Sequence, residues 1–167
     1  AELVKAVKKA GRIAAEGVIV IKASADKHRV VMLEVNSETD FVAKDENFRN
    51  FVAQLATVAL DNATHTLDVL LKAPMNGKTV EECRAELVAR IGENISIRRV
   101  VLLTDDHPIA TYLHGTRIGV LVVSEKTDEA LAQDIAMHVA ASKPEVVSAE
   151  DVPVDRMNAE KEIFIAQ

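Results

Sequence analysis

The sequence predicts an α+β fold made of two related subdomains, each an antiparallel β-hairpin or small sheet with helices packed on it. Two pairs of short β-branched runs are each followed by an apolar stripe at helical spacing, which is typical of a hairpin covered by a helix. The segments 33–40 and 121–128 carry Leu, Val, Thr and Asp at the same offsets, and Arg29-Val30 matches Arg117-Ile118. A duplicated ββα unit explains this likeness, and coincidence between two ordinary strand–cap–helix units is the alternative.

The composition is that of a folded chain with room for a core. Its 167 residues suit one large or two small domains. No uninterrupted apolar run approaches the roughly 20 residues that a membrane span needs. The net charge of −6 argues against a broad nucleic-acid-binding surface. The single cysteine, Cys83, cannot form an internal disulfide and fits a reducing compartment. No signal-like segment is visible, and both ends fall inside helical patterns as if cut from a longer protein.

The first subdomain is expected to span residues 1–104. Helices are expected where apolar residues recur with a 3.6-residue period, and strands where β-branched residues cluster between turn residues. The lysines of the leading helix are expected to face solvent. The expected elements are, in order, a leading helix that ends near Gly17, strands at 18–21 and 30–35 around a turn at 24–27, a helix after Asp45, a short helix at 67–71, a turn at Asn76-Gly77, a helix at 80–90 and a strand at 95–103.

Capping signals mark the ends of these helices. Asp45 can accept hydrogen bonds from the first turn of the helix that follows it. Thr79 and Glu82 have the spacing of a capping box. Gly92 suits the left-handed conformation that closes a helix.

The second subdomain is expected to span residues 105–152 and to be incomplete. It begins after the polar segment 104–108, which has the character of a boundary. The expected elements are strands at 109–113 and 118–123 around Gly115-Thr116, a helix at 128–141, and, over 153–167, the start of a protruding helical hairpin.

The residue patterns exclude the common catalytic and metal sites. Gly77-Lys78-Thr79 imitates the end of a phosphate-binding loop, but Lys72 stands where that loop needs its first glycine. The five histidines form no His-x-x-x-His pair, and one cysteine cannot build a zinc framework. Asp105-Asp106 lacks the alternating oxygen ligands of a calcium loop. We therefore expect a binding surface, with no catalytic residue, metal or cofactor.

One polar corner, between the strand and the helix in the stretch 33–44, carries Phe41 in a chain that has only four phenylalanines, one tyrosine and no tryptophan. Either Phe41 is a hydrophobic staple that packs on the next turn, or it contacts a partner. Asp40 beside it can stabilise the start of the helix, contact a partner, or do both. His114, next to Gly115 at the tip of the second hairpin, is a further candidate because a turn explains the glycine but not the histidine.

Five stretches, in the same order as in a known family, resemble elongation factor Ts, the nucleotide-exchange factor for the GTPase elongation factor Tu. Together they span nearly the whole chain, and five ordered stretches are far more specific than one hexapeptide. The stretches are Lys8-Lys9-Ala10-Gly11, Thr39-Asp40-Phe41-Val42-Ala43-Lys44, Arg90-Ile91-Gly92-Glu93-Asn94-Ile95 with Arg98-Arg99, Tyr112-Leu113-His114-Gly115, and His138-Val139-Ala140-Ala141-Ser142-Lys143-Pro144.

The resemblance implies guanine-nucleotide exchange on elongation factor Tu, without covalent chemistry and without direct contact to nucleic acid or membrane. In this family the Asp-Phe pair reaches into the GTP-binding domain near the magnesium site, the phenylalanine enters a hydrophobic pocket, and the histidine lies close by. It implies action in the cytoplasm, with an organelle matrix left open, as is the oligomeric state. The implied partner-binding residues are Thr39, Asp40, Phe41, Val42, Ile91, Gly92, His114 and Gly115.

The chain also departs from the family pattern. Nothing here matches the small helical domain with which the family begins, and the chain stops as the helical hairpin of the family would start. The alternative function is a scaffold of the same lineage that docks on a partner without releasing nucleotide.

Overall fold

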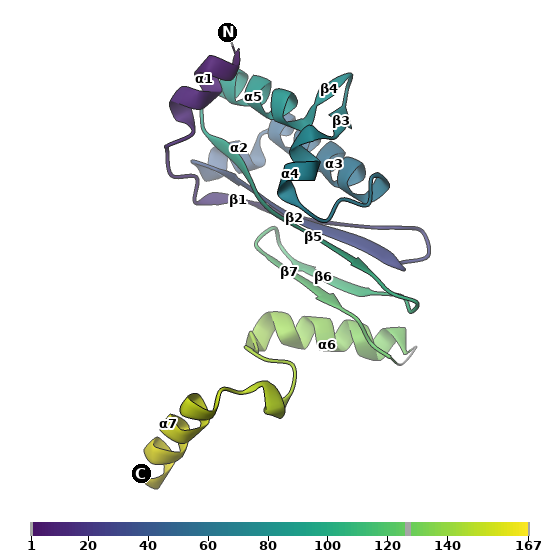
Figure 1. The fold of residues 1–167 in the computed structure, drawn as a ribbon, viewed down its shortest axis with the longest axis vertical. Coiled ribbons are helices and arrows are strands. Elements are labelled where there is room, and N and C mark those ends of the chain that lie inside the picture. The colour runs from purple at the N-terminus through teal and green to yellow at the C-terminus, as the bar shows by residue number, and fades with distance from the viewer. Residues whose placement is uncertain (1, 126–127, 167) are drawn as a thin grey trace.

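The computed structural model describes residues 2–125 and 128–166, and it confirms the predicted α+β class. Helices and small antiparallel sheets follow one another along the chain (Figure 1). The elements are, in order, α1 (Glu2–Lys9), β1 (Glu16–Ala23), β2 (Arg29–Ser37), α2 (Asp40–Lys44), α3 (Glu46–Asp61), α4 (Leu67–Lys72), β3 (Pro74–Met75), β4 (Lys78–Thr79), α5 (Val80–Ile91), β5 (Ile95–Thr104), β6 (Ala110–His114), β7 (Ile118–Val122), α6 (Glu129–Ser142), a short 3-10 helix (Ala149–Asp151) and α7 (Val154–Ile165).

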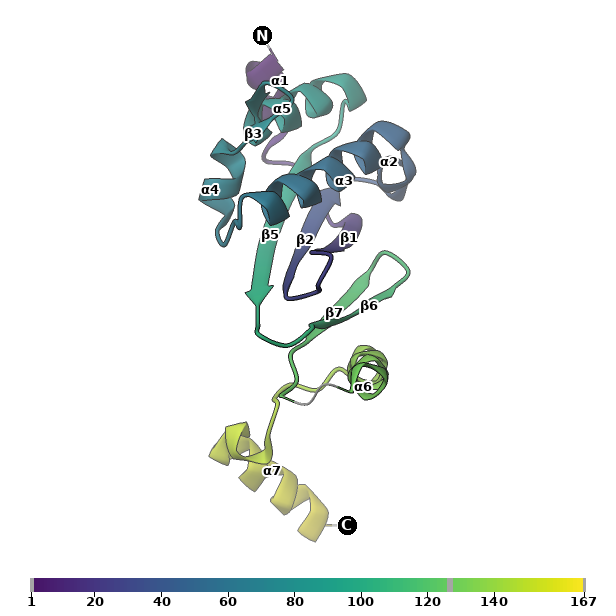
Figure 2. The same cartoon turned by 90° about the vertical axis from the view of Figure 1, so that its right-hand side faces the viewer.

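The largest sheet has three antiparallel strands in the order β1-β2-β5. Alternate residues of its central strand, Val31, Leu33 and Val35, are buried on one face. The helices α3 and α5 cover that face (Figures 1 and 2) and contribute Phe48 and Val88 to the same hydrophobic cluster. Apolar side chains that recur every two residues in the strand and about every 3.6 residues in the helices therefore pack into one core.

The second hairpin, β6–β7, lies on the other side of this sheet, and α6 covers the hairpin in turn (Figure 1). Gly119 on β7 permits the close approach. A Cβ atom at this position would lie 2.6 Å from Met32 Sδ and 2.8 Å from Ile19 Cγ2. The side chains of Met32 and Ile19 thus occupy the space that a side chain at residue 119 would need.

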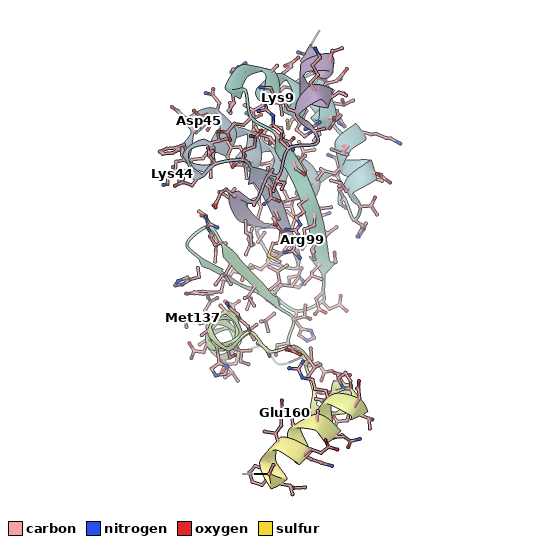
Figure 3. All side chains as sticks on the ribbon, turned by 90° about the vertical axis from the view of Figure 1, so that its left-hand side faces the viewer. Lys9, Lys44, Asp45, Arg99, Met137 and Glu160 are labelled. Atoms are coloured by element: carbon pink, nitrogen blue, oxygen red, sulfur yellow. The ribbon has the colours of Figure 1, made fainter. Side chains whose placement is uncertain are left out.

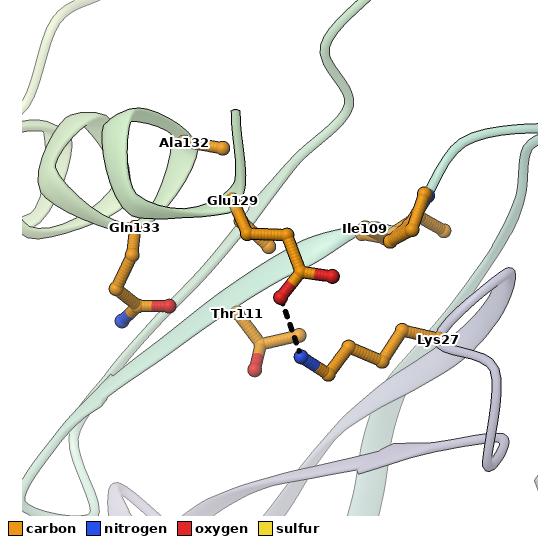
Figure 4. A pocket seen from close by; sticks show the side chains of 8 residues that line it. Lys27, Ile109, Thr111, Glu129, Ala132 and Gln133 are labelled. Atoms are coloured by element: carbon orange, nitrogen blue, oxygen red, sulfur yellow. Dashed lines mark hydrogen bonds and ion pairs between the residues drawn. The ribbon is translucent and has the colours of Figure 1, made fainter. Parts of the chain in front are cut away.

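Polar contacts at the turn between β1 and β2 hold the second hairpin in place. Asp105 N–H donates to His28 O at 2.9 Å, and Ile109 N–H donates to Lys27 O at 2.9 Å. The Lys27 ammonium also pairs with Glu129, at the start of α6, at 3.2 Å beside a small pocket (Figure 4). Both partners of this ion pair are exposed, so the pair contributes at most about 1 kcal/mol. The backbone bonds are the main tie.

The leading helix is shorter than predicted. It ends at Lys9 rather than near Gly17, and Ile13, which the helical pattern included, is 86% exposed. The side chain of Asn94 holds the segment after α1 out of helical bonding, because its amide donates to Arg12 O at 2.8 Å and to Ala10 O at 3.4 Å.

The predicted helix caps are confirmed. Asp45 Oδ1 accepts the N–H groups of the first turn of α3, at 2.8 Å and 3.2 Å. Thr79 and Glu82 form the capping box that opens α5. Gly92 closes α5 in the left-handed conformation, with φ 90°.

Both units place a helix across an antiparallel hairpin, as the internal repeat predicted, but the two helices bury different side chains. The repeat aligns the helices when the first copy is given four extra residues after Asp40. It then aligns the buried Phe51 with Ile135, which is 40% exposed. Lys126 and Thr127 of the shared motif lie outside the described residues, so the equivalence of the two corners stays a prediction. The buried stripe of α3 includes Phe48, Val52 and Ala56, whereas the corresponding positions of α6 are Ala132, Ala136 and Ala140.

The last helix, α7, extends away from the rest of the chain (Figure 2), and none of its described residues is buried. Within residues 2–125 and 128–166, no helix combines the length and the apolar character needed to cross a bilayer. The division into 1–104, 105–152 and 153–167 stays a proposal; it is supported by the separate hydrophobic clusters of the two hairpin units.

Gly17 provides a test of the sheet. Its φ is 137°, and a Cβ atom here would lie 2.2 Å from Val35 O. Gly17→Ala should lower the free energy of unfolding by about 2–4 kcal/mol, because the side chain would be strained and would displace the backbone of β2. Urea denaturation measures the change. Gly11→Ala is the control, since a Cβ there meets nothing within 4 Å; equal stability of the two variants would contradict the argument.

Candidate partner-binding site

The corner between β2 and α2, residues 39–42, is organised by its first and last residues. Thr39 is the N-cap of α2, and its hydroxyl oxygen accepts the N–H of Val42 at 3.4 Å. Val42 turns inward and is buried. The two residues between them, Asp40 and Phe41, are left on the outside of the turn.

The carboxylate of Glu93 fixes Thr39 from a distant part of the chain. The N–H of Thr39 donates to Glu93 Oε2 at 3.0 Å, and the Thr39 hydroxyl donates to Glu93 Oε1 at 2.8 Å. Glu38 makes the reverse contact, since its Oε1 accepts the N–H of Asn94 at 2.6 Å. These crossed bonds join the corner to the turn between α5 and β5.

Sequence reasoning missed the role of Glu93. Fifty-four positions separate this residue from Thr39, so no local pattern links the two. The sequence signal that points to Glu93 is its place directly after Gly92, which marks a helix end and belongs to one of the family-like stretches.

Phe41 is 79% exposed, although phenylalanine side chains are usually buried. A hydrophobic staple joins the residue before an N-cap to the fourth residue of the helix, whereas Phe41 stands two positions after the cap Thr39. The staple interpretation is therefore wrong. Phe48 and Phe51, by contrast, are buried. Phe164 on α7 resembles Phe41 in being 81% exposed.

Asp40 forms an ion pair within its own helix. Lys44 Nζ, one turn further on, lies 2.7 Å from Asp40 Oδ2; Figure 3 labels Lys44 at this outer edge of the molecule. The hydrogen bond and the charge of Lys44 hold the pKa of the Asp40 carboxyl below its usual 3.8, and the charge of Arg117 adds to this. The cap is Thr39 rather than Asp40, so Asp40 presents an anion in the first turn, where the helix dipole favours it.

Ile91 and Gly92 lie at the end of α5, where both are half-buried. Ile91 packs against the main hydrophobic cluster, and Gly92 N–H donates to Val88 O at 2.9 Å. The lysines of the leading helix were expected to face solvent. Lys9 differs from this expectation, because its ammonium donates to Gly92 O. A role of Ile91 and Gly92 in binding a partner stays a prediction.

His114 and Gly115 lie exposed at the tip of the β6–β7 hairpin. Gly115 takes the turn with φ 60°, and His114 Nδ1 lies 3.1 Å from the Tyr112 hydroxyl. The next residue, Thr116, accepts the N–H of Ile19 through its carbonyl oxygen at 2.7 Å. The tip is thereby tied to β1.

The corner and the hairpin tip meet the same end of β1. Glu16, the first residue of β1, pairs with Ser37 at the end of β2 and forms an ion pair with Arg117 beside the tip. Arg117 is also close enough to lower the pKa of Asp40. The structure therefore brings two sequence-predicted sites to one region, although they are far apart in the chain.

The side chains gathered here suit binding. Over the described residues, 2–125 and 128–166, no group of three or more His, Cys, Asp or Glu side chains is placed to hold a metal ion. Burial raises the pKa of the Cys83 thiol, which disfavours the reactive thiolate. What the corner and the tip offer is an aromatic ring, a carboxylate and an imidazole on backbone that is held in place by hydrogen bonds.

A comparison with protein families decides the lineage. Residues 38–167 match the family described as Elongation factor TS. This chain belongs to the elongation factor Ts family. The matched residues include the corner, the turn with Glu93 and the hairpin tip, whereas β1 and β2 lie before the matched range.

Individual relatives extend the similarity to the first helix and β1. Elongation factor Ts of Legionella pneumophila (strain Paris) is 56% identical over 164 residues, which is 98% of this chain and 56% of the relative. Elongation factor Ts of Halorhodospira halophila is 50% identical over 165 residues, covering 99% of this chain and 57% of the relative. The protein of the same name from Arthrospira platensis is 48% identical and is covered to 66%. The chain thus spans little more than half the length of the first two relatives.

The Asp40–Lys44 pair gives a pH prediction. Lys44→Met should raise the pKa of the Asp40 carboxyl toward 3.8, because Lys44 is the main cause of its lowering. Since the folded-state pKa is the lower one, the contribution of this pair to stability is present above pH 3.8 and is lost as the pH falls through the folded-state pKa. Carboxyl-detected NMR measures the titration. Lys161→Met, on the distant α7, should leave it unchanged, and an unshifted Asp40 in the Lys44 variant would contradict the assignment.

Proposed function

We propose that this chain promotes the release of GDP from the GTPase elongation factor Tu by inserting the Asp40-Phe41 corner near its magnesium and nucleotide site. Membership of the elongation factor Ts family supports the broader role in translation and nucleotide exchange. The proposed activity is a matter of binding, with no covalent step, cofactor or nucleic-acid contact. Its compartment is the one in which translation takes place, the bacterial cytoplasm or an organelle matrix.

The exposed ring of Phe41 is the observation that carries this proposal. Folding does not use the ring, because it is 79% exposed while Val42 beside it fills the core. The ring is nonetheless held by a capped turn whose cap is bonded to Glu93. An exposed apolar side chain on a fixed backbone loses little entropy when a partner's pocket receives it.

The energy available from this ring fits a moderate acceleration of release. An exchange factor must bind the nucleotide-free or distorted GTPase more tightly than the GDP-bound one, and each tenfold preference requires about 1.4 kcal/mol. Burial of one phenylalanine supplies roughly 1.5–3 kcal/mol. Phe41 alone would therefore account for about one or two factors of ten, and other contacts must supply any larger effect.

The proposal assigns the Asp40 carboxylate and the hairpin tip to such further contacts. Asp40 is an anion beside the ring, and Mg²⁺ demands a near-ideal octahedral shell, so a carboxylate or an adjacent displacement near that ion would weaken nucleotide binding. His114 is exposed at the hairpin tip, which adjoins the same end of β1 as the corner. Both assignments are proposals on the same footing as that of Phe41.

Phe41→Ala tests the central contact. At a saturating concentration of the factor, the variant should release GDP from loaded elongation factor Tu roughly tenfold to a hundredfold more slowly in a stopped-flow assay, because the burial energy of the ring is lost. Its melting temperature should stay close to that of the unmodified chain. A variant that melts early yet exchanges normally would overturn the proposal.

Two other phenylalanines serve as matched controls. Phe164→Ala removes an equally exposed ring from α7 and should change neither release nor stability. Phe48→Ala removes a fully buried ring and should cost about 3–5 kcal/mol of stability. If Phe41→Ala and the unmodified chain bind elongation factor Tu but neither accelerates release, the chain is the docking scaffold of the alternative interpretation.

His114→Ala tests the second contact. The variant should weaken the complex with elongation factor Tu, measured by calorimetry, by about threefold to thirtyfold, the range for losing one well-placed interface side chain. Thermal stability should not fall, because the ring is exposed and its described partner is the hydroxyl of Tyr112, 3.1 Å away. Tyr112→Phe removes that hydroxyl and keeps the imidazole, so it separates the two groups. Unchanged affinity for His114→Ala would remove His114 from the interface.

A further inference from the structure

We infer that Glu93 is a positioning residue for the corner, acting on exchange through Phe41 without touching the partner. The inference rests on the proposed function for its effect on GDP release, but its structural part stands alone. Both oxygens of the Glu93 carboxylate are used on one residue, Thr39, through its N–H and its hydroxyl. Glu93 is half-buried under the corner, whereas Phe41 stands outside it.

The corner needs such an anchor because α2 is too short to hold itself. It has five residues, and an isolated helix shorter than about 12–15 residues is marginal in water. At its inner end, burial of Val42 fixes the turn to the core. At its outer end, Thr39 is held by the two bonds to Glu93, and its carbonyl oxygen also accepts the hydroxyl of Ser37, at the end of β2, at 2.9 Å.

Glu93 is itself held in place by the end of α5. Gly92, in the left-handed conformation, ends the helix and turns the chain toward the corner. Its neighbour Asn94 is buried and donates its side-chain amide to Arg12 O at 2.8 Å, while its N–H donates to Glu38 at 2.6 Å. The turn that carries Glu93 is therefore bonded to the segment after α1 and to the corner. A carboxylate on such a support can fix a second loop.

The consequence for exchange follows from population arithmetic. If only a fraction of the molecules has a correctly formed corner, the apparent affinity for the partner is the intrinsic affinity multiplied by that fraction. The Phe41 ring is then in position to bind in only that fraction of the molecules. Removal of the Glu93 carboxylate should therefore act on the same step as removal of Phe41. Once the ring is absent, the position of the corner should matter much less.

The test uses Glu93→Ala and a matched control, Glu82→Ala. Glu82 also accepts the N–H and the hydroxyl of a threonine, Thr79, at 2.8 Å and 3.0 Å, but through one carboxylate oxygen and at the other end of α5. In stopped-flow release of GDP from elongation factor Tu, Glu93→Ala should be slower by about threefold to tenfold, as expected for a formed fraction of about one in three to one in ten. Glu82→Ala should release GDP at the unmodified rate. Equal rates for the two variants would overturn the inference.

A double-mutant cycle separates positioning from a general loss of structure. In the Phe41→Ala background, adding Glu93→Ala should change release by less than about 1.5-fold, because both substitutions disable one interaction. Effects that multiply would mean that Glu93 acts independently of Phe41 and would overturn the inference. Glu93→Gln keeps one acceptor oxygen and the side-chain size; it should lie between the alanine variant and the unmodified chain, and it replaces Glu93→Ala if that variant does not fold.

Amide hydrogen exchange of the free chain gives a readout that does not depend on the GTPase. In Glu93→Ala the N–H of Thr39 should exchange at least about tenfold faster, since its acceptor is gone, whereas the core amide of Leu33 should not change. Unchanged protection of Thr39 would overturn the inference whatever the release rates are. If Phe41→Ala releases GDP at the unmodified rate, the proposed function fails instead, and the protection of Thr39 alone decides whether Glu93 positions the corner.

Discussion

The carboxylates of Glu93 and Glu38 join the corner that carries Phe41 to the turn between α5 and β5. Glu93 binds the N–H and the hydroxyl of Thr39, and Glu38 binds the N–H of Asn94, so each segment supplies the acceptor for the other. Hydrogen bonds to ionised acceptors are about twice as strong as neutral ones, and these are partly shielded from water. They allow a helix of a single turn to persist at a sheet edge, and that turn carries Phe41 outward.

The three-stranded sheet and the second hairpin hold the corner and the hairpin tip in fixed positions relative to each other. The first sheet buries one face under helices and receives the second hairpin on the other, where Gly119 removes the side chain that would keep the layers apart. One backbone bond, from Ile19 to Thr116, then fixes the hairpin tip beside the start of β1. The corner adjoins the same end of the sheet, because Glu16 pairs with Ser37. His114 and Phe41 are therefore held by one framework rather than by separate flexible loops.

Such rigidity is what a nucleotide-exchange factor of this size would need. A single ring supplies only about 1.5–3 kcal/mol, and ordering a mobile loop on binding would consume a comparable amount. On the proposed function, a corner that is already formed would leave most of that energy for distorting the partner. The same logic explains why the carboxylate of Asp40 is paired with Lys44 in the free chain: the pair keeps Asp40 ionised and fixed without burying it.

Several features of this protein are encoded in local sequence patterns alone. The α+β class, the two hairpins, the caps at Asp45, Thr79 and Gly92, and the family all follow from periodicity, capping chemistry and short motifs that act over a few residues. The tertiary structure sets where α1 ends, because Asn94, far along the chain, donates its side-chain amide to Arg12 O just after the helix. It also decided that Phe41 faces solvent and that Glu93 holds Thr39. Such contacts depend on which distant segments the packed core brings side by side. The spacing of hydrophobic residues does not predict which segments these are.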